Sequence, residues 1–260
     1  MHLLIPTPFP GRTGILFTVI FIGWSLIAYR ATPEAHFALQ SDSVVEVTHN
    51  NGVWRFMPAQ ISAPTRVGLL FLPGALVDPV AYAPLARAVA EAGFLALILE
   101  IPRRGAFGGA DDPQLRARAA TLMQNSNTAL RWVLAGHSRG AVIVSELASR
   151  NPEGLAGVIL IGTSHPRDVS LAALRVPIMK IFGTLDGLAT VGEVMANQDK
   201  LPASTEWVEV TGGNHSQFGW YGFQPGDRRA IITPAQQRDQ MIQSVLDMLR
   251  SCSAVGEPAC

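Results

Sequence analysis

The chain has 260 residues, of which 48% are hydrophobic and 15% are charged, and its formal net charge is zero. This length and composition suffice for one large core and argue against disorder, and an α/β domain of this size need not divide. Because no basic patch dominates, we expect no nucleic acid partner.

The chain begins with an apolar segment between two arginines. Residues 13–29 carry no charge, and Arg12 and Arg30 close the run on either side. As a helix, this run would span roughly 25 Å, slightly less than the bilayer core of about 30 Å. Residues 28–30 lack the small-residue pattern of a signal-peptide cleavage site. We therefore expect residues 1–30 to be a single-pass membrane anchor, rather than a cleaved signal peptide or a buried core helix.

The charges around this segment say little about its orientation. One arginine flanks each end, and the terminal amine favours a cytoplasmic N-terminus. We therefore expect the rest of the chain to lie outside the cytoplasm. We expect residues 31–42 to be a linker, residues 43–250 to form the main domain and residues 251–260 to be a polar tail.

The main domain alternates predicted strands and helices. Apolar and polar residues alternate on either side of Asn51 and Gly52. This pattern predicts an antiparallel hairpin in which residues 44–48 pair with residues 53–57. Apolar runs then predict buried strands at 67–72 and 94–99, and further strands are predicted at 132–136, 157–162, 176–183 and 205–210. Helices are predicted at 78–92, 113–130, 141–148, 191–200 and 234–249. This alternation predicts an α/β fold, a mostly parallel sheet with helices on both faces.

A glycine-flanked serine separates one of these strands from its helix. The apolar run ends at Gly136, Ser138 follows two residues later, and Gly140 opens the helical stretch. A sharp strand-to-helix turn exposes the serine hydroxyl in a strained backbone conformation and places it at a helix N-terminus. The alternative interpretation is a serine that caps an ordinary helix.

Two further candidates follow later strands at the same edge of the sheet. Asp186 follows the strand that ends at Gly183, and His215 follows the strand that ends at residue 210. Serine, acid and histidine in this order can form a nucleophile, base and orienting acid. Asp168 is the alternative acid, because it also follows a strand. If Asp186 is the acid, its carboxylate should lie within hydrogen-bond distance of His215 Nδ1.

Backbone donors for a developing oxyanion are expected from two places. One is the N–H of Arg139, directly after the serine, and the other is the N–H of Ala75, in the loop after residues 67–72. Leu76 is the neighbouring alternative to Ala75. Among the other histidines, we expect His137 to shape the serine turn and His165 to be a solvated loop residue.

The loops over this edge suggest what lines the substrate site. Residues 163–175 are too few for an inserted cap, so residues 102–109 and 217–227 are left over the site. These loops carry aromatic and cationic side chains. The alternative interpretation of Arg103 and Arg104 is that they are solvated loop residues. The candidate substrate-lining residues are Leu76, Arg103, Arg104, Phe107, Phe218 and Trp220.

Four segments together resemble a known family: residues 72–82, 136–140, 182–186 and 212–219. They look like those of the bacterial dienelactone-hydrolase-like or carboxylesterase-like α/β hydrolases, over about residues 44–250. The resemblance implies the α/β-hydrolase fold, no metal and no organic cofactor. Dienelactone hydrolases proper use a cysteine nucleophile where this chain has Ser138, which favours ordinary esters over lactones.

We therefore expect a serine hydrolase that cleaves small or medium carboxylic esters through an acyl-enzyme, with Ser138, Asp186 and His215 as its triad. Short-chain esters should react faster than long-chain lipids, without interfacial activation. An acyltransferase with the same triad and a non-catalytic binding domain of this fold are the alternatives. The expected partners are a small acyl substrate and a membrane.

The two cysteines, Cys252 and Cys260, lie near the end of the chain. They are too few for a disulfide framework, and no residues at zinc-binding spacing accompany them. The sequence leaves open whether they form one disulfide or remain thiols.

Overall fold

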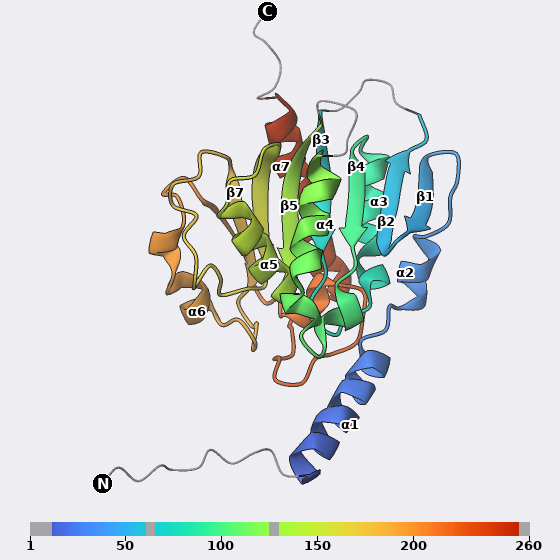
Figure 1. Ribbon diagram of the computed structural model, residues 1–260, viewed down its shortest axis with the longest axis vertical. Helices are drawn as coiled ribbons and strands as arrows, with labels where there is room; N and C mark the ends of the chain where they lie inside the picture. The colour runs from blue at the N-terminus through green and yellow to red at the C-terminus, as the bar shows by residue number, and fades with distance from the viewer. Residues whose placement is uncertain (1–11, 61–65, 125–129, 255–260) are drawn as a thin grey trace, which may run out of the picture.

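The computed structural model describes residues 12–60, 66–124 and 130–254. Within them, eight strands form one sheet in the order β1-β2-β4-β3-β5-β6-β7-β8 (Figure 1). The hairpin and the β2–β4 pair are antiparallel, and all other neighbours are parallel. The predicted hairpin and mostly parallel sheet are therefore confirmed. The strands are β1 Val45–Asn50, β2 Val53–Pro58, β3 Val67–Leu72, β4 Leu95–Leu99, β5 Arg131–His137, β6 Leu155–Ile161, β7 Ile178–Gly183 and β8 Glu206–Val210.

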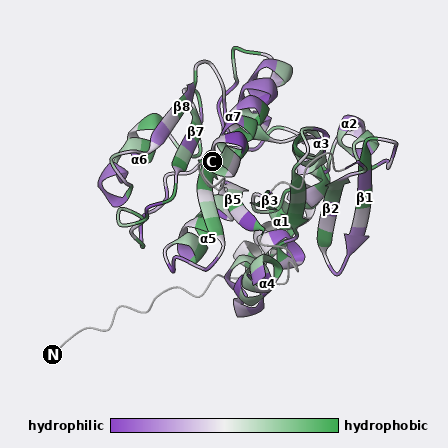
Figure 2. Cartoon of the chain, turned by 90° about the horizontal axis from the view of Figure 1, so that it is seen from above, coloured by the Kyte–Doolittle hydropathy of each residue, from purple (hydrophilic) through white to green (hydrophobic). Residues whose placement is uncertain are grey.

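Helices cover both faces of the sheet because its central strands are apolar on both sides. In β3, Leu69 and Phe71 face a core that includes helices α3 (Ala83–Glu91) and α7 (Pro234–Ala254). The alternate residues of the same strand pack with α4 (Pro113–Gln124) and α5 (Arg139–Ala148). Figure 2 shows the two pairs of helices on opposite sides of the sheet. This arrangement explains why the central strands read as continuous apolar runs.

The parallel strands end at one common edge of the sheet. The arrowhead of β4 points to the lower edge in Figure 1. Because β3, β5, β6, β7 and β8 run parallel to β4, the loops after them reach the same edge. In open α/β sheets, this carboxyl edge is where ligands bind. The predicted site residues should therefore lie at this edge.

Several predicted helices differ from the observed ones at their ends. The segment expected as one helix over 78–92 begins with a 3₁₀ turn, Pro79–Tyr82, which the Asp78 side chain caps. The predicted helix over 191–200 is α6, Val191–Met195, followed by a separate 3₁₀ turn, Gln198–Lys200. Helix α4 is described as far as Gln124, and its predicted continuation lies largely outside the described residues.

The expected membrane anchor appears as helix α1, Arg12–Ala28. Within the part of the chain that the structure describes, no helix is both long enough and apolar enough to cross a lipid bilayer. The expected transmembrane helix is thus not supported. Residues 1–11 of the predicted anchor lie outside the described residues.

The C-terminal end of α1 is attached to the domain rather than free of it. Ser25 and Tyr29 are buried, and Tyr29 belongs to the main hydrophobic core. The Tyr29 carbonyl accepts a hydrogen bond from the Asp78 N–H at 3.0 Å. α1 therefore projects from the carboxyl edge of the sheet, as Figure 1 shows.

The segment 31–42, expected to be a linker, is packed against the domain. It contains helix α2, Pro33–Phe37, which Thr32 caps and whose Ala35 is fully buried. Arg87 of α3 donates hydrogen bonds to the Ala38 and Gln40 carbonyls. Buried alanines provide this packing, and periodicity barely distinguishes them from loop residues.

The C-terminal helix is longer than predicted. α7 continues to Ala254, so residues 251–254 belong to a helix and not to a polar tail. Cys252 is buried there, and its Sγ lies 3.4 Å from the Ala156 carbonyl oxygen. Burial raises the pKa of this thiol. The open question of a disulfide also concerns Cys260, which lies outside the described residues.

Candidate active site

The predicted serine turn is present between β5 and α5. Ser138 adopts φ 51° and ψ −118°, a strained conformation for a residue other than glycine. A Cβ on Gly136 would lie 2.5 Å from the carbonyl carbon of Gly140. A Cβ on Gly140 would collide with the Leu72 carbonyl oxygen of β3. The two glycines are therefore required by close packing of the turn, as the sequence pattern predicted.

Asp186 and His215 form a buried pair. Asp186 Oδ2 lies 2.9 Å from His215 Nδ1, and both side chains are almost wholly buried. Asp186 Oδ1 accepts the N–H groups of Leu188 and Ala189 at 2.8 and 2.7 Å. These bonds fix the carboxylate, so the imidazole donates from Nδ1. The contact expected for Asp186 is present, and the alternative acid Asp168 does not occupy that place.

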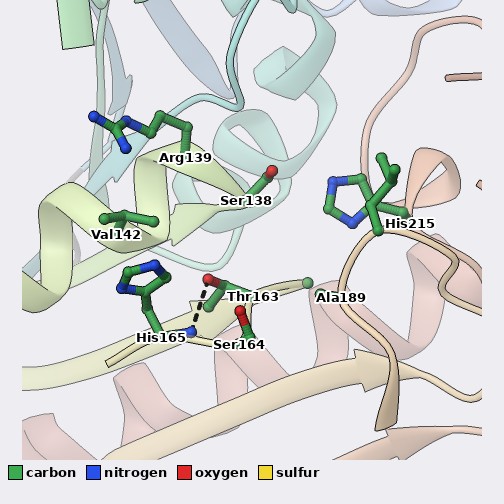
Figure 3. Close-up of a pocket in the computed structure, with 10 residues that line it drawn as sticks. Ser138, Arg139, Val142, Thr163, Ser164, His165, Ala189 and His215 are labelled. Carbon is green, nitrogen blue, oxygen red and sulfur yellow. Dashed lines mark hydrogen bonds between the residues drawn. The ribbon is translucent and has the colours of Figure 1, made fainter. Parts of the chain in front are cut away.

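The other ring nitrogen of His215 is available to a reactant. His215 Nε2 is buried and has no hydrogen-bond partner among the residues that the structure describes. With the proton on Nδ1, this nitrogen carries a lone pair. His215 and Ser138 line the same cavity (Figure 3). The arrangement can therefore accept a proton within the cavity.

A second aspartate, which the sequence analysis did not identify, holds the histidine loop. Asp227 Oδ1 accepts the N–H groups of Gly187 and His215 at 3.0 and 3.2 Å. Its Oδ2 accepts the N–H and the hydroxyl of Ser216 at 2.8 and 2.6 Å. One carboxylate thus ties the loop after β8 to the loop after β7. Nothing in its sequence context separates Asp227 from an ordinary turn aspartate.

The structure distinguishes between the two candidate oxyanion donors of the loop after β3. The Leu76 N–H donates to the Arg104 carbonyl at 2.6 Å and is therefore occupied. The N–H groups of Ala75 and Arg139 have no hydrogen-bond partner within residues 12–60, 66–124 and 130–254. Leu76 itself has a φ of 64°, so the loop carries backbone strain beside the free donor.

A buried hydrogen-bonded chain connects this loop to the serine turn. The Gly74 N–H donates to Tyr82 Oη at 3.2 Å, and Tyr82 Oη lies 2.8 Å from His137 Nδ1. The Tyr82 hydroxyl therefore donates its proton to His137. Burial and the neighbouring His215 keep the pKa of His137 well below its ordinary value, so its ring stays neutral. The His137 and His215 ring centroids are 4.5 Å apart.

The cavity beside Ser138 has a volume of about 210 Å³. One wall is formed by Arg139 and Val142 of α5, and another by Leu188 and Ala189 after β7. A third wall is polar and consists of Thr163, Ser164 and His165, which directly follow β6 (Figure 3). The residues between β6 and β7 contain no helix and thus no inserted cap, as expected.

The candidate lining residues of the sequence analysis do not line this cavity. Phe218 and Trp220 are buried in the main core. Phe107 is 67% exposed. The sequence showed which loops reach this edge, but not which way their side chains turn.

The arginines of the loop after β4 are engaged elsewhere. Arg104 pairs with Asp78 at 2.7 Å and donates to the Leu26 carbonyl of α1 at 3.2 Å. Arg103 donates to the carbonyls of Ala106 and Phe107. Arg104 thus holds the loop and the end of α1, whereas Arg103 is exposed, in agreement with the alternative of a solvated arginine.

No group of three or more His, Cys, Asp or Glu side chains is arranged to hold a metal ion in the described part of the chain.

Comparisons with known proteins concern the fold and the family of the chain. A comparison with curated proteins found no match. Among solved structures, a dienelactone hydrolase from Anabaena variabilis is similar, with a TM-score of 0.59 and 16% identity over 80% of this chain and 98% of that one. A ferulic acid esterase from Streptomyces cinnamoneus has a TM-score of 0.59 and 16% identity, over 78% of this chain and 71% of its own.

A putative dienelactone hydrolase from Klebsiella pneumoniae is similar too, with a TM-score of 0.54 and 16% identity over 76% of this chain and 92% of that one. At these identities the likeness concerns the fold. The model of the alpha/beta hydrolase family matches residues 68–239, which is more than half of the chain. The fold and the position of the candidate site at the carboxyl edge of the sheet agree with this family model. The chain belongs to the alpha/beta hydrolase family.

Proposed function

We propose that the protein is a serine hydrolase that cleaves small carboxylic esters through an acyl-enzyme on Ser138. One observation carries this proposal. The strained serine lines the same cavity as His215. The Nδ1 atom of His215 is paired with buried Asp186, and its Nε2 atom has no partner among the described residues. A serine that only capped α5 would need neither the strained backbone nor the buried pair.

The proposed reaction has two halves. His215 Nε2 takes the proton of Ser138 Oγ as the oxygen attacks the ester carbonyl carbon, and Asp186 stabilises the resulting imidazolium. The carbonyl oxygen becomes an oxyanion that accepts the N–H groups of Ala75 and Arg139. His215 then gives its proton to the leaving alcohol. In the second half, water attacks the acyl-enzyme by the same path and releases the acid.

The size of the cavity supports a small substrate. Its volume of about 210 Å³ lies below the range of roughly 300–1,000 Å³ that is usual for pockets that hold drug-sized ligands. The absence of an inserted cap between β6 and β7 supports activity without a lid that opens at a lipid surface. Short-chain esters should therefore be cleaved faster than long-chain lipids.

We also infer that α1 attaches the protein to a membrane, with the catalytic domain outside the cytoplasm. Large apolar side chains are exposed along this helix, among them Ile15, Val19 and Ile27. No charged residue lies between Arg12 and Arg30. A helix with this composition is poorly solvated by water on every side.

Labelling with a fluorophosphonate, followed by a panel of 4-nitrophenyl esters of increasing chain length, tests the catalytic proposal. Ser138→Ala should abolish labelling and reduce turnover by at least about 10³-fold, because only oxyanion stabilisation and binding remain. Ser145→Ala is the matched control, since it removes a buried hydroxyl of α5 that bonds only to the Ala141 carbonyl of the same helix. Labelling of the Ser138→Ala protein would refute the assignment. Quantifying free acid against transferred acyl groups separates hydrolysis from acyl transfer.

A further inference from the structure

The polar wall of the cavity is not needed for the proposed chemistry, and its presence calls for a reason. Thr163, Ser164 and His165 follow β6 directly and lie together on one side of the cavity, opposite His215 (Figure 3). A site for a plain alkyl group would be lined by apolar side chains, because unused polar groups lose affinity when the substrate desolvates them. The wall therefore suits a substrate with its own hydrogen-bonding atom.

This wall is held in place by other parts of the chain. The Thr163 hydroxyl accepts the His165 N–H at 3.2 Å. The Ser164 hydroxyl accepts a hydrogen bond from Arg167, and the Ser164 carbonyl accepts one from Asn197 at 3.2 Å. In both side chains the hydroxyl oxygen is used as an acceptor, so the hydroxyl proton remains free to donate. The loop is thus preorganised to donate hydrogen bonds.

The His165 ring supplies both a donor and an acceptor. Neither ring nitrogen forms a hydrogen bond with another described residue. Burial, followed by the nearby Arg167 guanidinium, lowers the pKa of His165, so the ring is neutral at pH 7. A neutral imidazole has one N–H and one lone pair. It can therefore bond to a hydroxyl in either direction, or to a carbonyl oxygen.

The charges near this wall do not favour an anionic group. The guanidinium of Arg139 pairs with Asp111 and points away from the cavity (Figure 3). The guanidinium of Arg167 is shared between Ser164 and Glu193. Each nearby cation already has a carboxylate partner, so a substrate carboxylate would find no unpaired cation.

We propose that the substrate group in this cavity is small and uncharged and carries a hydroxyl or keto oxygen that hydrogen-bonds to His165 and Ser164. This proposal rests on the proposed esterase function and narrows its substrates to short oxygen-bearing esters. The opposite wall, Val142, Leu188 and Ala189, accommodates the carbon skeleton of the same group. The polar wall thus selects the oxygen, while the apolar wall sets the size of the group.

Matched esters test this inference. In one series, 4-nitrophenyl butyrate, 3-hydroxybutyrate and monosuccinate differ in the acyl group. In the other series, ethyl and 2-hydroxyethyl butyrate differ in the alcohol. Each kcat/KM is divided by the hydroxide-catalysed rate of the same ester, which removes differences in intrinsic reactivity. In one of the two series, the hydroxyl-bearing ester should be favoured by about tenfold, the effect of one net hydrogen bond.

Substitutions at the wall assign the preference to it. His165→Phe should reduce the preference to near one, whereas His165→Gln, which keeps a donor and an acceptor, should retain part of it. Leu188→Ala is the matched control on the apolar wall, and it should change kcat/KM for all esters without changing the ratio.

Three results would overturn the inference while the proposed function stands: no preference in either series, a preference that survives His165→Phe, or a preference for the monosuccinate. Failure of the proposed function looks different, since no ester would then show turnover that depends on Ser138. That result would overturn both proposals.

Discussion

At the scale of single residues, His137 is the least expected feature of the site. The sequence analysis expected it only to shape the serine turn. The structure adds that it accepts a hydrogen bond from Tyr82, whose hydroxyl also accepts the Gly74 N–H. This chain joins the loop of the Ala75 donor to the residue before Ser138. A pattern of residue types cannot show such a link, because its members lie far apart in the sequence.

Tyr82→Phe tests this link. The variant leaves the Gly74 N–H and His137 Nδ1 without their partner, so the donor loop should be less well placed in the transition state. We expect kcat to fall by about tenfold, with KM within about twofold, because buried unmade hydrogen bonds cost roughly 1–3 kcal/mol. Tyr221→Phe is the control, since it removes a buried tyrosine hydroxyl that bonds to Gln224. Equal losses in both variants, or a change in KM alone, would contradict a positioning role.

A buried lysine, also at this scale, should make stability depend on pH. Lys180 of β7 is 1% exposed, donates to the Val194 carbonyl at 3.3 Å and lies over the Trp207 ring. Burial, with a smaller effect of Arg167, lowers its pKa from 10.5 to about 8. Between pH 8 and 10.5 the unfolded chain therefore binds a proton that the folded chain has released. The free energy of unfolding should rise across this window as pH increases.

Lys180→Met removes the proton-binding group at similar size. At pH 7 the variant should be more stable than the parent by on the order of 1–3 kcal/mol, and the difference should shrink above pH 8. Urea unfolding at pH 7 to 10.5 measures it. Lys200→Met, in the 3₁₀ turn after α6 where no residue is buried, is the control variant. A constant difference between Lys180→Met and the parent at all pH values would contradict the argument.

At the scale of elements, the predictions succeeded where burial dictates the pattern. The strand over 67–72 was predicted with its observed bounds, because β3 is buried on both faces and has no polar residue. The turn at Ser138 was predictable because close packing requires glycines at 136 and 140. Helix ends were less accurate. The last turn of α7 contains serines and a cysteine, which read as a polar tail, yet Cys252 is buried.

In the candidate site, the sequence likewise predicted the course of the main chain better than the positions of the loop side chains. The elements that carry Ser138, Asp186 and His215 follow from apolar runs, so the sequence indicated their common edge. The positions of loop side chains do not follow, since they depend on contacts across the fold. Phe218 packs against His137 at 5.8 Å between ring centroids, and Arg104 reaches the end of α1. Both were expected in the substrate site and are part of its support.

At the scale of the whole molecule, α1 and the candidate active site share one edge. Arg104 bonds to the Leu26 carbonyl of α1 and to Asp78, while its own carbonyl holds Leu76 beside the proposed oxyanion donor. The Thr32 N–H, just after α1, donates to the Trp220 carbonyl in the loop that follows His215. A membrane-attached α1 would therefore hold the carboxyl edge of the sheet towards the membrane.

Substitution of the exposed side of α1 tests the proposed attachment. Ile15, Val19 and Ile27 are 55%, 52% and 63% exposed. Replacing all three with serine avoids the buried Ser25 and Tyr29, so the domain should stay folded and keep its esterase activity in detergent within about twofold. We expect the parent protein to sediment with membranes and the triple variant to move to the soluble fraction, because burying each such side chain in an apolar phase is worth roughly 1.5–3 kcal/mol.

The control is Ile231→Ser, which removes an apolar side chain that is 82% exposed on the loop before α7. It should leave sedimentation unchanged if α1 is the attachment. A parent protein found in the soluble fraction, or a triple variant that still sediments, would contradict the proposal. Protease treatment of intact bacterial spheroplasts tests the orientation. The catalytic domain should be digested if it lies outside the cytoplasm, whereas protection until lysis would place it inside and reverse the orientation that the terminal amine favours.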